Sequence, residues 1–276
     1  MAGAEEEMFF FDGGAGVRLL GFLHRPFGLA RDCGVVYCHP FAEERNQSQG
    51  CVVRAARSIA AKGIPVLRFD FSGCGDSEGV LEEASADAWI AEIGAAVDTL
   101  RRLTGVKRVG LWGLRSGANL AAHYGAARDD IAFGVYWQPV SDLKTSITQF
   151  LRQKLSSEMA AGSGEGFSVK GLVEKMETGG TVEVIGYSIR KTLYQSLASR
   201  TGPFAKMEFA HPVFLAAVTE SETVPDAIAR TAQGLKAPNA PVPLFHAKEA
   251  PFWDRYWRWE SPILEAGTAD WIGSVA

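Results

Sequence analysis

The sequence is poor in the features that mark membrane, secreted and metal-binding proteins. It has four cysteines in 276 residues, and their positions show no paired metal-ligand spacing. It contains neither an apolar run of about 18 residues nor the charged and apolar segments of a cleavable signal. We therefore expect a cytoplasmic protein with no membrane span, no metal and no cofactor.

A surplus of basic residues is missing as well. The chain has 28 Lys and Arg residues against 32 Asp and Glu residues, which gives a formal net charge of −4. No global positive field would draw in nucleic acid or an anionic bilayer, so nucleic acid is not an expected partner. The length fits one α/β core that spans residues 1–276 and carries an inserted segment.

Strand-like and helix-like segments alternate along most of the chain. After two opening strands, near residues 8–12 and 17–26, most of the short apolar runs are followed by a helical pattern. This alternation predicts a mostly parallel, twisted sheet with helices on both faces and ligands at the carboxyl ends of the strands. The later strands are predicted at 34–38, 65–71, 109–112, 131–137, 212–219 and 242–246, and the helices at 48–62, 86–103, 116–128 and 262–272.

The alternation breaks between about residues 140 and 207, a segment that we call the cap. Its spacing predicts two helices, a flexible glycine-rich linker and a strand, at 143–161, 168–177, 162–166 and 181–187. We expect the cap to lie over the carboxyl edge of the sheet, because the first helix has an apolar face that must be buried. That face consists of Ile147, Phe150, Leu151 and Leu155. The alternative is a set of surface helices with no part in ligand selection.

A serine is missing where the sequence otherwise has a catalytic turn. An apolar strand runs through Gly113-Leu-Arg115-Ser-Gly117 into a helix of small residues, which is the outline of a Gly-x-Ser-x-Gly nucleophile elbow. Only the register centred on Arg115 has glycine at both flanking positions, because Leu114 is not small. We predict that Arg115 occupies the raised tip and that Ser116 begins the helix, with its amide available to an anion.

Two further loops follow the pattern of α/β-hydrolases. The strand end Tyr37-Cys-His39-Pro-Phe41 resembles the loop that supplies one amide of the oxyanion hole. Residues 70–79 match the Asp-x-x-Gly-x-Gly-x-Ser loop after the next strand. Together with the elbow, these motifs have the order and spacing of the α/β-hydrolase fold, which we predict for the chain. The amides of Phe41 and Ser116 are the expected oxyanion donors.

The other two positions of a catalytic triad lack the residues that catalysis usually needs. The loop after the last predicted strand, where the histidine is expected, carries Pro251. His246 lies about five residues early, as a packed histidine or a displaced base. Glu222, with Glu220 nearby, is the candidate for the acid. Because a triad needs three groups in hydrogen-bond contact, we expect ordinary serine-hydrolase activity to be absent or very weak.

The positive charge of Arg115 at the elbow tip should have an anionic partner. The helix N-terminus destabilises this cation by roughly 0.3–1 kcal/mol, and the strained turn costs about 1–3 kcal/mol more. Its partner is expected from the loop after His39, at Glu43 or Glu44, or from Glu220 or Glu222; a ligand carboxylate or phosphate is the alternative. A direct catalytic role for Arg115 or Ser116 is a third reading. The predicted pocket consists of His39, Phe41, Glu43, Glu44, Asn46 and Trp253.

Seven motifs spread over nearly the whole chain, cap included, match one family more closely than the fold in general. They are His-Pro-Phe-Ala-Glu-Glu-Arg-Asn at 39–46, Gly-Cys-Gly-Asp-Ser at 73–77, Leu-Trp-Gly-Leu-Arg at 111–115, Trp-Gln-Pro at 137–139, Gln-Phe-Leu-Arg at 149–152, Val-Glu-Val-Ile-Gly-Tyr at 182–187 and Pro-Phe-Trp at 251–253. The chain thereby resembles the exosortase A system-associated hydrolase type 2 family. The resemblance implies a bacterial cytoplasmic protein encoded with exosortase and exopolysaccharide genes, often near acyl-carrier and acyl-ligase functions.

Two functions of different classes follow. The first is a pseudoenzyme that binds a ligand or a partner protein in a capped pocket. The ligand would be a small acyl, thioester or glycan-linked compound, either free or bound to a carrier protein. The second is an active ester or thioester hydrolase or acyltransferase that uses an unconventional nucleophile or an activated water. The missing serine and histidine favour the first, whereas the intact elbow and cap keep the second open.

Overall fold

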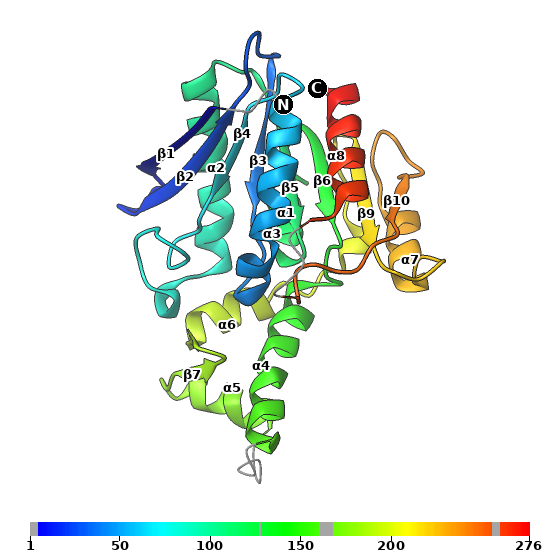
Figure 1. Cartoon of the computed structure of the whole chain (residues 1–276). Helices are drawn as coiled ribbons and strands as arrows, with labels where there is room; N and C mark the ends of the chain where they lie inside the picture. Colours follow the sequence, from blue (N-terminus) through cyan, green and yellow to red (C-terminus); the bar gives the residue numbers. More distant parts are fainter. Residues whose placement is uncertain (1–4, 127, 161–167, 256–259) are drawn as a thin grey trace.

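A computed structural model describes residues 5–126, 128–160, 168–255 and 260–276 (Figure 1). The predicted linker at 162–166 lies outside the described residues. Within the described part of the chain, every helix is too short or too polar to span a bilayer.

Eight strands form one sheet in the order β1-β2-β4-β3-β5-β6-β9-β10. β2 pairs antiparallel with β1 and β4, and all other neighbours in this sheet are parallel. β3 and β9 are buried at every residue, as expected for strands between two layers of helices. The strands are β1 (Glu5–Asp12), β2 (Arg18–Arg25), β3 (Cys33–Cys38), β4 (Val66–Phe69), β5 (Arg108–Leu114), β6 (Ile131–Trp137), β9 (Val213–Val218) and β10 (Leu244–Ala247).

Helices cover both faces of this sheet. α1 (Glu43–Ala60) and α8 (Pro262–Val275) pack together on one face, over a core that includes Trp112 and Trp137. α2 (Ala86–Thr104) and α3 (Ser116–Gly125) pack together on the other. Figure 1 shows α7 (Asp226–Gly234) beside β9 and β10. The parallel sheet between two helical layers is the α/β architecture predicted from the sequence.

The cap gathers beyond the carboxyl ends of the parallel strands (Figure 1). Ile147, Phe150 and Leu151 of its first helix are buried, and Leu155 packs against the same core. The elements of the cap are α4 (Leu143–Ala160), α5 (Val169–Glu177), the hairpin of β7 (Val182–Val184) and β8 (Tyr187–Ile189), α6 (Lys191–Ala198) and the 3₁₀ turn η2 (Phe204–Lys206); a second 3₁₀ turn, η1 (Leu81–Glu83), precedes α2.

Several predicted element boundaries were wrong. α1 begins at Glu43 and not at Ser48, so Glu43 and Glu44 belong to a helix and not to a loop. Two acidic residues in the first turn suit the positive end of the helix dipole. The predicted strand at 181–187 is a hairpin, because Ile185 and Gly186, with φ of 43° and 87°, reverse the chain. The helices α6 and α7 were not predicted.

Candidate functional site

Arg115 occupies the tip of the turn between β5 and α3. Its backbone has φ 54° and ψ −124°, a conformation that strains any residue with a side chain. A Cβ on Gly113 would lie 2.6 Å from the Cα of Ala118, and one on Gly117 would lie 2.3 Å from the carbonyl oxygen of Cys38. Both flanking glycines are therefore required by close backbone contacts, as in a nucleophile elbow.

The side chain of Arg115 is held by one carboxylate and one aromatic ring. Its Nε donates to Oε1 of Glu44 at 3.1 Å, and the two side chains are 22% and 31% exposed. Its guanidinium carbon lies 5.3 Å from the ring centroid of Trp253. Burial raises the pKa of the Glu44 carboxyl, and the charge of Arg115 acts in the opposite direction. Glu44 is thus the carboxylate that forms the ion pair with Arg115 at the elbow.

The other three candidate carboxylates have different partners. Glu43 accepts from Tyr187, Glu220 pairs with Arg255, and Glu222 pairs with Lys248. The side chain of Glu222 is 83% exposed, because the loop after β9 projects it into solvent. In the described contacts it meets neither Arg115 nor a histidine, so the geometry gives no support to its predicted role as the triad acid.

The Ser116 hydroxyl accepts a hydrogen bond from one of the two amides expected in the oxyanion hole. The backbone amide of Phe41 donates to Ser116 Oγ at 2.9 Å, and Ser116 is 4% exposed. The expected pair of free amides is therefore corrected: Phe41 already has an acceptor, whereas Ser116, as the first residue of α3, has no intrahelical acceptor for its own amide. The same contact joins the elbow to the loop after β3.

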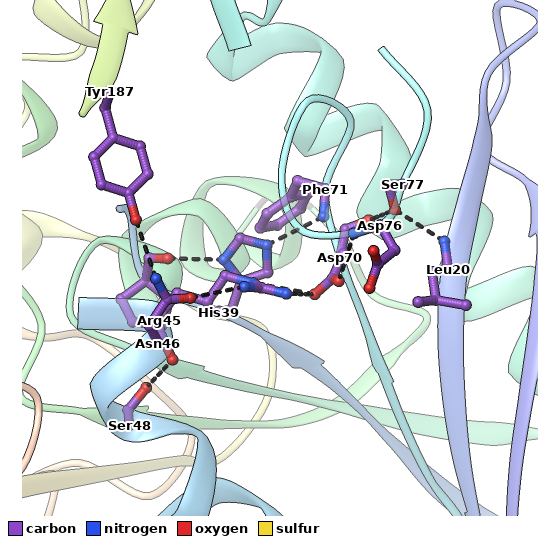
Figure 2. Close-up of polar contacts among 11 residues, drawn as sticks. Leu20, His39, Arg45, Asn46, Ser48, Asp70, Phe71, Asp76, Ser77 and Tyr187 are labelled. Atoms are coloured by element: carbon purple, nitrogen blue, oxygen red, sulfur yellow. Dashed lines mark hydrogen bonds and ion pairs between the residues drawn. The ribbon is translucent and has the colours of Figure 1, made fainter. Parts of the chain in front are cut away.

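His39 is a neutral structural residue. Its Nδ1 lies 2.7 Å from the carbonyl oxygen of Pro40, and its Nε2 accepts from the amide of Phe71 at 3.1 Å (Figure 2). These partners assign the proton to Nδ1. Burial lowers the pKa of His39 to about 4. With both nitrogens engaged, the ring positions two loops and has no free nitrogen to act as a base.

A largely buried ion pair that was not predicted from the sequence supports the same region. Arg45 binds Oδ1 of Asp70 through Nη2 at 2.6 Å and Nε at 3.1 Å (Figure 2). Ser77 Oγ donates to the carbonyl of Asp70 and accepts from the amide of Leu20. A Cβ on Gly75 would lie 2.1 Å from the Asp70 carboxylate. The loop at 70–79 is thus fixed by Arg45 and serves as scaffold.

A second polar cluster ties the cap to α1. Tyr187 of β8 donates to Oε1 of Glu43 at 3.0 Å, and Nδ2 of Asn46 lies 3.3 Å from the same oxygen. Nδ2 of Asn46 also donates to the Tyr187 hydroxyl at 3.1 Å. Burial and the Glu43 carboxylate raise the pKa of Tyr187 to about 12, so it stays protonated at neutral pH. Asn46 and Glu43 thereby fix the cap hairpin above the elbow.

Buried residues occupy the loop after β10, where a triad histidine is expected. After β10, the buried Glu249 accepts from Ser261 and from the amide of Ile263, which fixes the start of α8. Phe252 is fully buried and Trp253 reaches Arg115. His246 lies inside β10, paired with Ala217 of β9. The described residues therefore contain no serine, histidine and carboxylate in mutual contact, and no cluster of metal-ligating side chains.

A cavity of about 150 Å³ lies between the elbow and α4. Its polar lining consists of Arg115, Glu43, Glu44, Ser146, Gln149 and Gln153, and its apolar lining of Phe41, Ala42, Phe150 and Ile185. A second cavity, of about 230 Å³, shares Phe41 and Ala42 and extends toward Tyr187 and Cys74. The six polar residues that line the first cavity come from three segments that are separated in the sequence: the start of α1, the elbow and α4.

The space beneath the cap, next to Ser116, is nearly full. This third cavity measures about 10 Å³ and is lined mainly by apolar side chains, among them Phe71, Trp89, Leu143 and Ile147. That volume holds about one water molecule. An acyl chain placed next to Ser116 would collide with these side chains, so a ligand would have to use one of the two larger cavities.

No protein-family model matches the sequence, and neither does any curated protein. Many solved structures match the fold. Est1E from Butyrivibrio proteoclasticus, solved with ferulic acid bound, has a TM-score of 0.70 at 16% identity over 97% of this chain and 98% of its own. Mouse alpha/beta hydrolase domain-containing protein 10 has a TM-score of 0.64 at 17% identity over 98% of this chain and 100% of its own.

An esterase from Pyrococcus furiosus is similar over 99% of this chain and 91% of its own, with a TM-score of 0.60 and 16% identity. Identities of this size establish the fold alone. With the strand order, the elbow and these neighbours, the chain has the α/β-hydrolase fold.

Proposed function

We propose that the protein is a non-hydrolytic binding protein built on the α/β-hydrolase fold. The observation that carries this proposal is the guanidinium of Arg115 at the elbow tip, paired with Glu44 and stacked on Trp253. A guanidinium is neither a nucleophile nor a general base at neutral pH. The ligand, a small acyl, thioester or glycan-linked compound or a segment of a partner, would occupy the cavity beside Arg115.

The biological setting is part of the same proposal. The motifs that resemble the exosortase A system-associated hydrolase type 2 family favour a cytoplasmic role in bacterial exopolysaccharide or exosortase systems. There the ligand would reach the site free or attached to a carrier protein. The elbow, the contact between Ser116 and Phe41 and the cap would then serve to shape a pocket.

The alternative is catalysis of ester or thioester cleavage, or acyl transfer, without a serine nucleophile. Glu44 favours it, because burial raises the pKa of this carboxyl and the group lines the open cavity. A carboxylate with a raised pKa is suited to activate a water molecule. In this reading the amide of Ser116 stabilises the oxyanion, Arg115 orients Glu44 and Glu222 has no role.

Covalent labelling and turnover decide between the two. The protein is incubated with a fluorophosphonate probe and, separately, with short-chain aryl esters and acyl thioesters, beside a serine esterase as positive control. We expect no labelled serine and no turnover above the buffer rate, because no base contacts Ser116 among the residues that the structure describes. Stoichiometric labelling that disappears in Ser116→Ala would refute the proposal, and turnover that disappears in Glu44→Gln would establish the alternative.

A further inference from the structure

The charges around the 150 Å³ cavity do not favour an anionic ligand. Among the described residues that line it, Arg115 is the only cation, and its Nε is bound to Glu44 at 3.1 Å. Glu43 lines the same cavity as a second carboxylate. A ligand carboxylate or phosphate bound by the other N–H groups of Arg115 would lie beside the carboxylates of Glu43 and Glu44, which are like charges. The charge of Arg115 is therefore balanced by carboxylates of the same lining, and the cavity has no net positive charge to attract an anion.

The lining residues from α4 offer uncharged hydrogen-bonding groups. Ser146, Gln149 and Gln153 lie three and four residues apart on α4, so their side chains share one face of the helix. Each carboxamide carries two donors and one acceptor oxygen. Within the described part of the chain, neither glutamine makes a side-chain hydrogen bond to another residue. Both are thus available to a ligand with hydroxyl or amide groups.

Ile185 adds an apolar side chain on a strained backbone to the lining of the cavity. It lies at the tip of the β7–β8 hairpin with φ 43°, a conformation that is rare for a β-branched residue. The residue is 49% exposed and lines the cavity together with Phe41 and Phe150, whose ring centroids lie 4.9 Å apart. Asn is the usual residue before Gly in such turns. An exposed isoleucine here gains contacts when an apolar surface covers it.

We infer that the cavity takes an uncharged ligand with hydroxyl or amide groups on one side and an apolar surface on the other. The polar side meets Gln149 and Gln153, and the apolar side meets Ile185. This inference rests on the proposed binding function and narrows its ligand class. Two sources share this chemistry, a neutral sugar ring and the amide arm of a pantetheine-type carrier.

Binding is measured by saturation-transfer NMR and calorimetry with cellobiose, pantetheine, hexanoate and inorganic phosphate as probes. We expect saturable binding of cellobiose or pantetheine, which identifies the source, and none of the two anions. The double variant Gln149→Leu, Gln153→Leu should weaken it at least tenfold, and Gln233→Leu, on the exposed surface of α7, should not change it. Tighter binding of either anion, or no saturable binding of either neutral probe, would overturn the inference.

Ile185→Asn tests the apolar contact independently of folding defects. The variant creates an Asn-Gly turn, so its Tm should rise by about 2–4 °C while binding of the neutral probe weakens. A variant with a higher Tm and unchanged binding would remove Ile185 from the site. A different result would refute the proposed function. Turnover of a thioester or ester would show that the protein is an enzyme, while the preference for neutral ligands would remain.

Discussion

Arg115 combines a strained backbone with a cation at a helix N-terminus. The strain costs about 1–3 kcal/mol and the dipole roughly 0.3–1 kcal/mol. Its pair with Glu44 is partly exposed and contributes about 0–1 kcal/mol, and the stack on Trp253 adds about 0.5–1 kcal/mol. The contacts are of the same order as the cost, so Arg115 contributes little net stability to the elbow.

Arg115→Gly should be more stable than Arg115→Ala by about 1–2 kcal/mol in free energy of unfolding, because only glycine relaxes the turn. Arg115→Ala keeps the strain, loses the ion pair and should fall below the wild type by about 1 kcal/mol. A fully buried pair would make this loss roughly 3–5 kcal/mol, but the side chains are 22% and 31% exposed. Urea titrations measure all three proteins.

The control for the glycine effect is Ala91→Gly, at an exposed position inside α2. There φ is helical, so glycine should lower the free energy of unfolding by about 0.5–1 kcal/mol. If Arg115→Gly is as destabilising as this control, the turn at Arg115 is not strained.

Ser116→Ala should lower the free energy of unfolding by about 1–2 kcal/mol, because it leaves the amide of Phe41 without its acceptor. Ser156→Ala, at an exposed position on α4, is the matched control and should change stability by less than about 0.5 kcal/mol. Equal effects of the two substitutions would show that the hydroxyl makes no stabilising contact. Chemical denaturation with a fluorescence readout suffices for the comparison.

At the scale of elements, the elbow depends on how closely α3 approaches β3. Gly117→Ala would place a Cβ 2.3 Å and 2.4 Å from the carbonyl oxygens of Cys38 and His39. Backbone atoms cannot move aside as a flexible side chain does, so we expect a loss of about 3 kcal/mol or more.

The matched change is Gly171→Ala in α5, where the nearest atom to the new Cβ would be the hydroxyl oxygen of Ser168 at 3.4 Å. It should raise stability by about 0.5–1 kcal/mol, as alanine does inside a helix. Thermal unfolding of the pair tests the geometry, and a tolerated Gly117→Ala would contradict the close approach.

Local rules were enough to predict the sheet and the elbow from the sequence. Strands such as β6 have apolar runs between turn residues, and Gly113 and Gly117 admit one register only. Local rules failed where tertiary contacts decide. The first turn of α1 is polar and has no helical apolar period, so its start at Glu43 depends on the sharp turn at Ala42, which has φ 53°. The hairpin at 182–189 was read as one strand because isoleucine is an unusual turn residue.

The contacts of the site were predictable only in part. Glu44 was one of four carboxylates considered for Arg115, since charge alone limits the candidates but not the choice among them. Arg45 and Asp70 lie 25 positions apart and meet only when α1 and the loop after β4 pack together. Rotation of the Ser116 hydroxyl toward Phe41 has no sequence signal at all.

The whole molecule buries three histidines in neutral form, which makes its stability depend on pH. Burial lowers the pKa of His24, His39 and His211 from 6.5 to about 4. Below pH 6.5 the unfolded chain takes up protons that the folded chain resists until about pH 4. The stability conferred by these groups is therefore complete above pH 6.5 and is lost as pH falls toward 4, by about 3 kcal/mol for each histidine.

His211→Leu isolates one of these contributions. In the described structure both ring nitrogens of His211 are buried without a hydrogen-bond partner, so an apolar side chain of similar size removes no contact of this kind. The variant cannot take up a proton in its unfolded state at this position. Its free energy of unfolding relative to the wild type should therefore increase by about 2 kcal/mol between pH 8 and pH 5. Urea titrations at the two pH values measure this change, in which the contributions of all other titrating groups cancel. A difference that stays constant between pH 8 and pH 5 would show that His211 is protonated in the folded protein or reaches solvent.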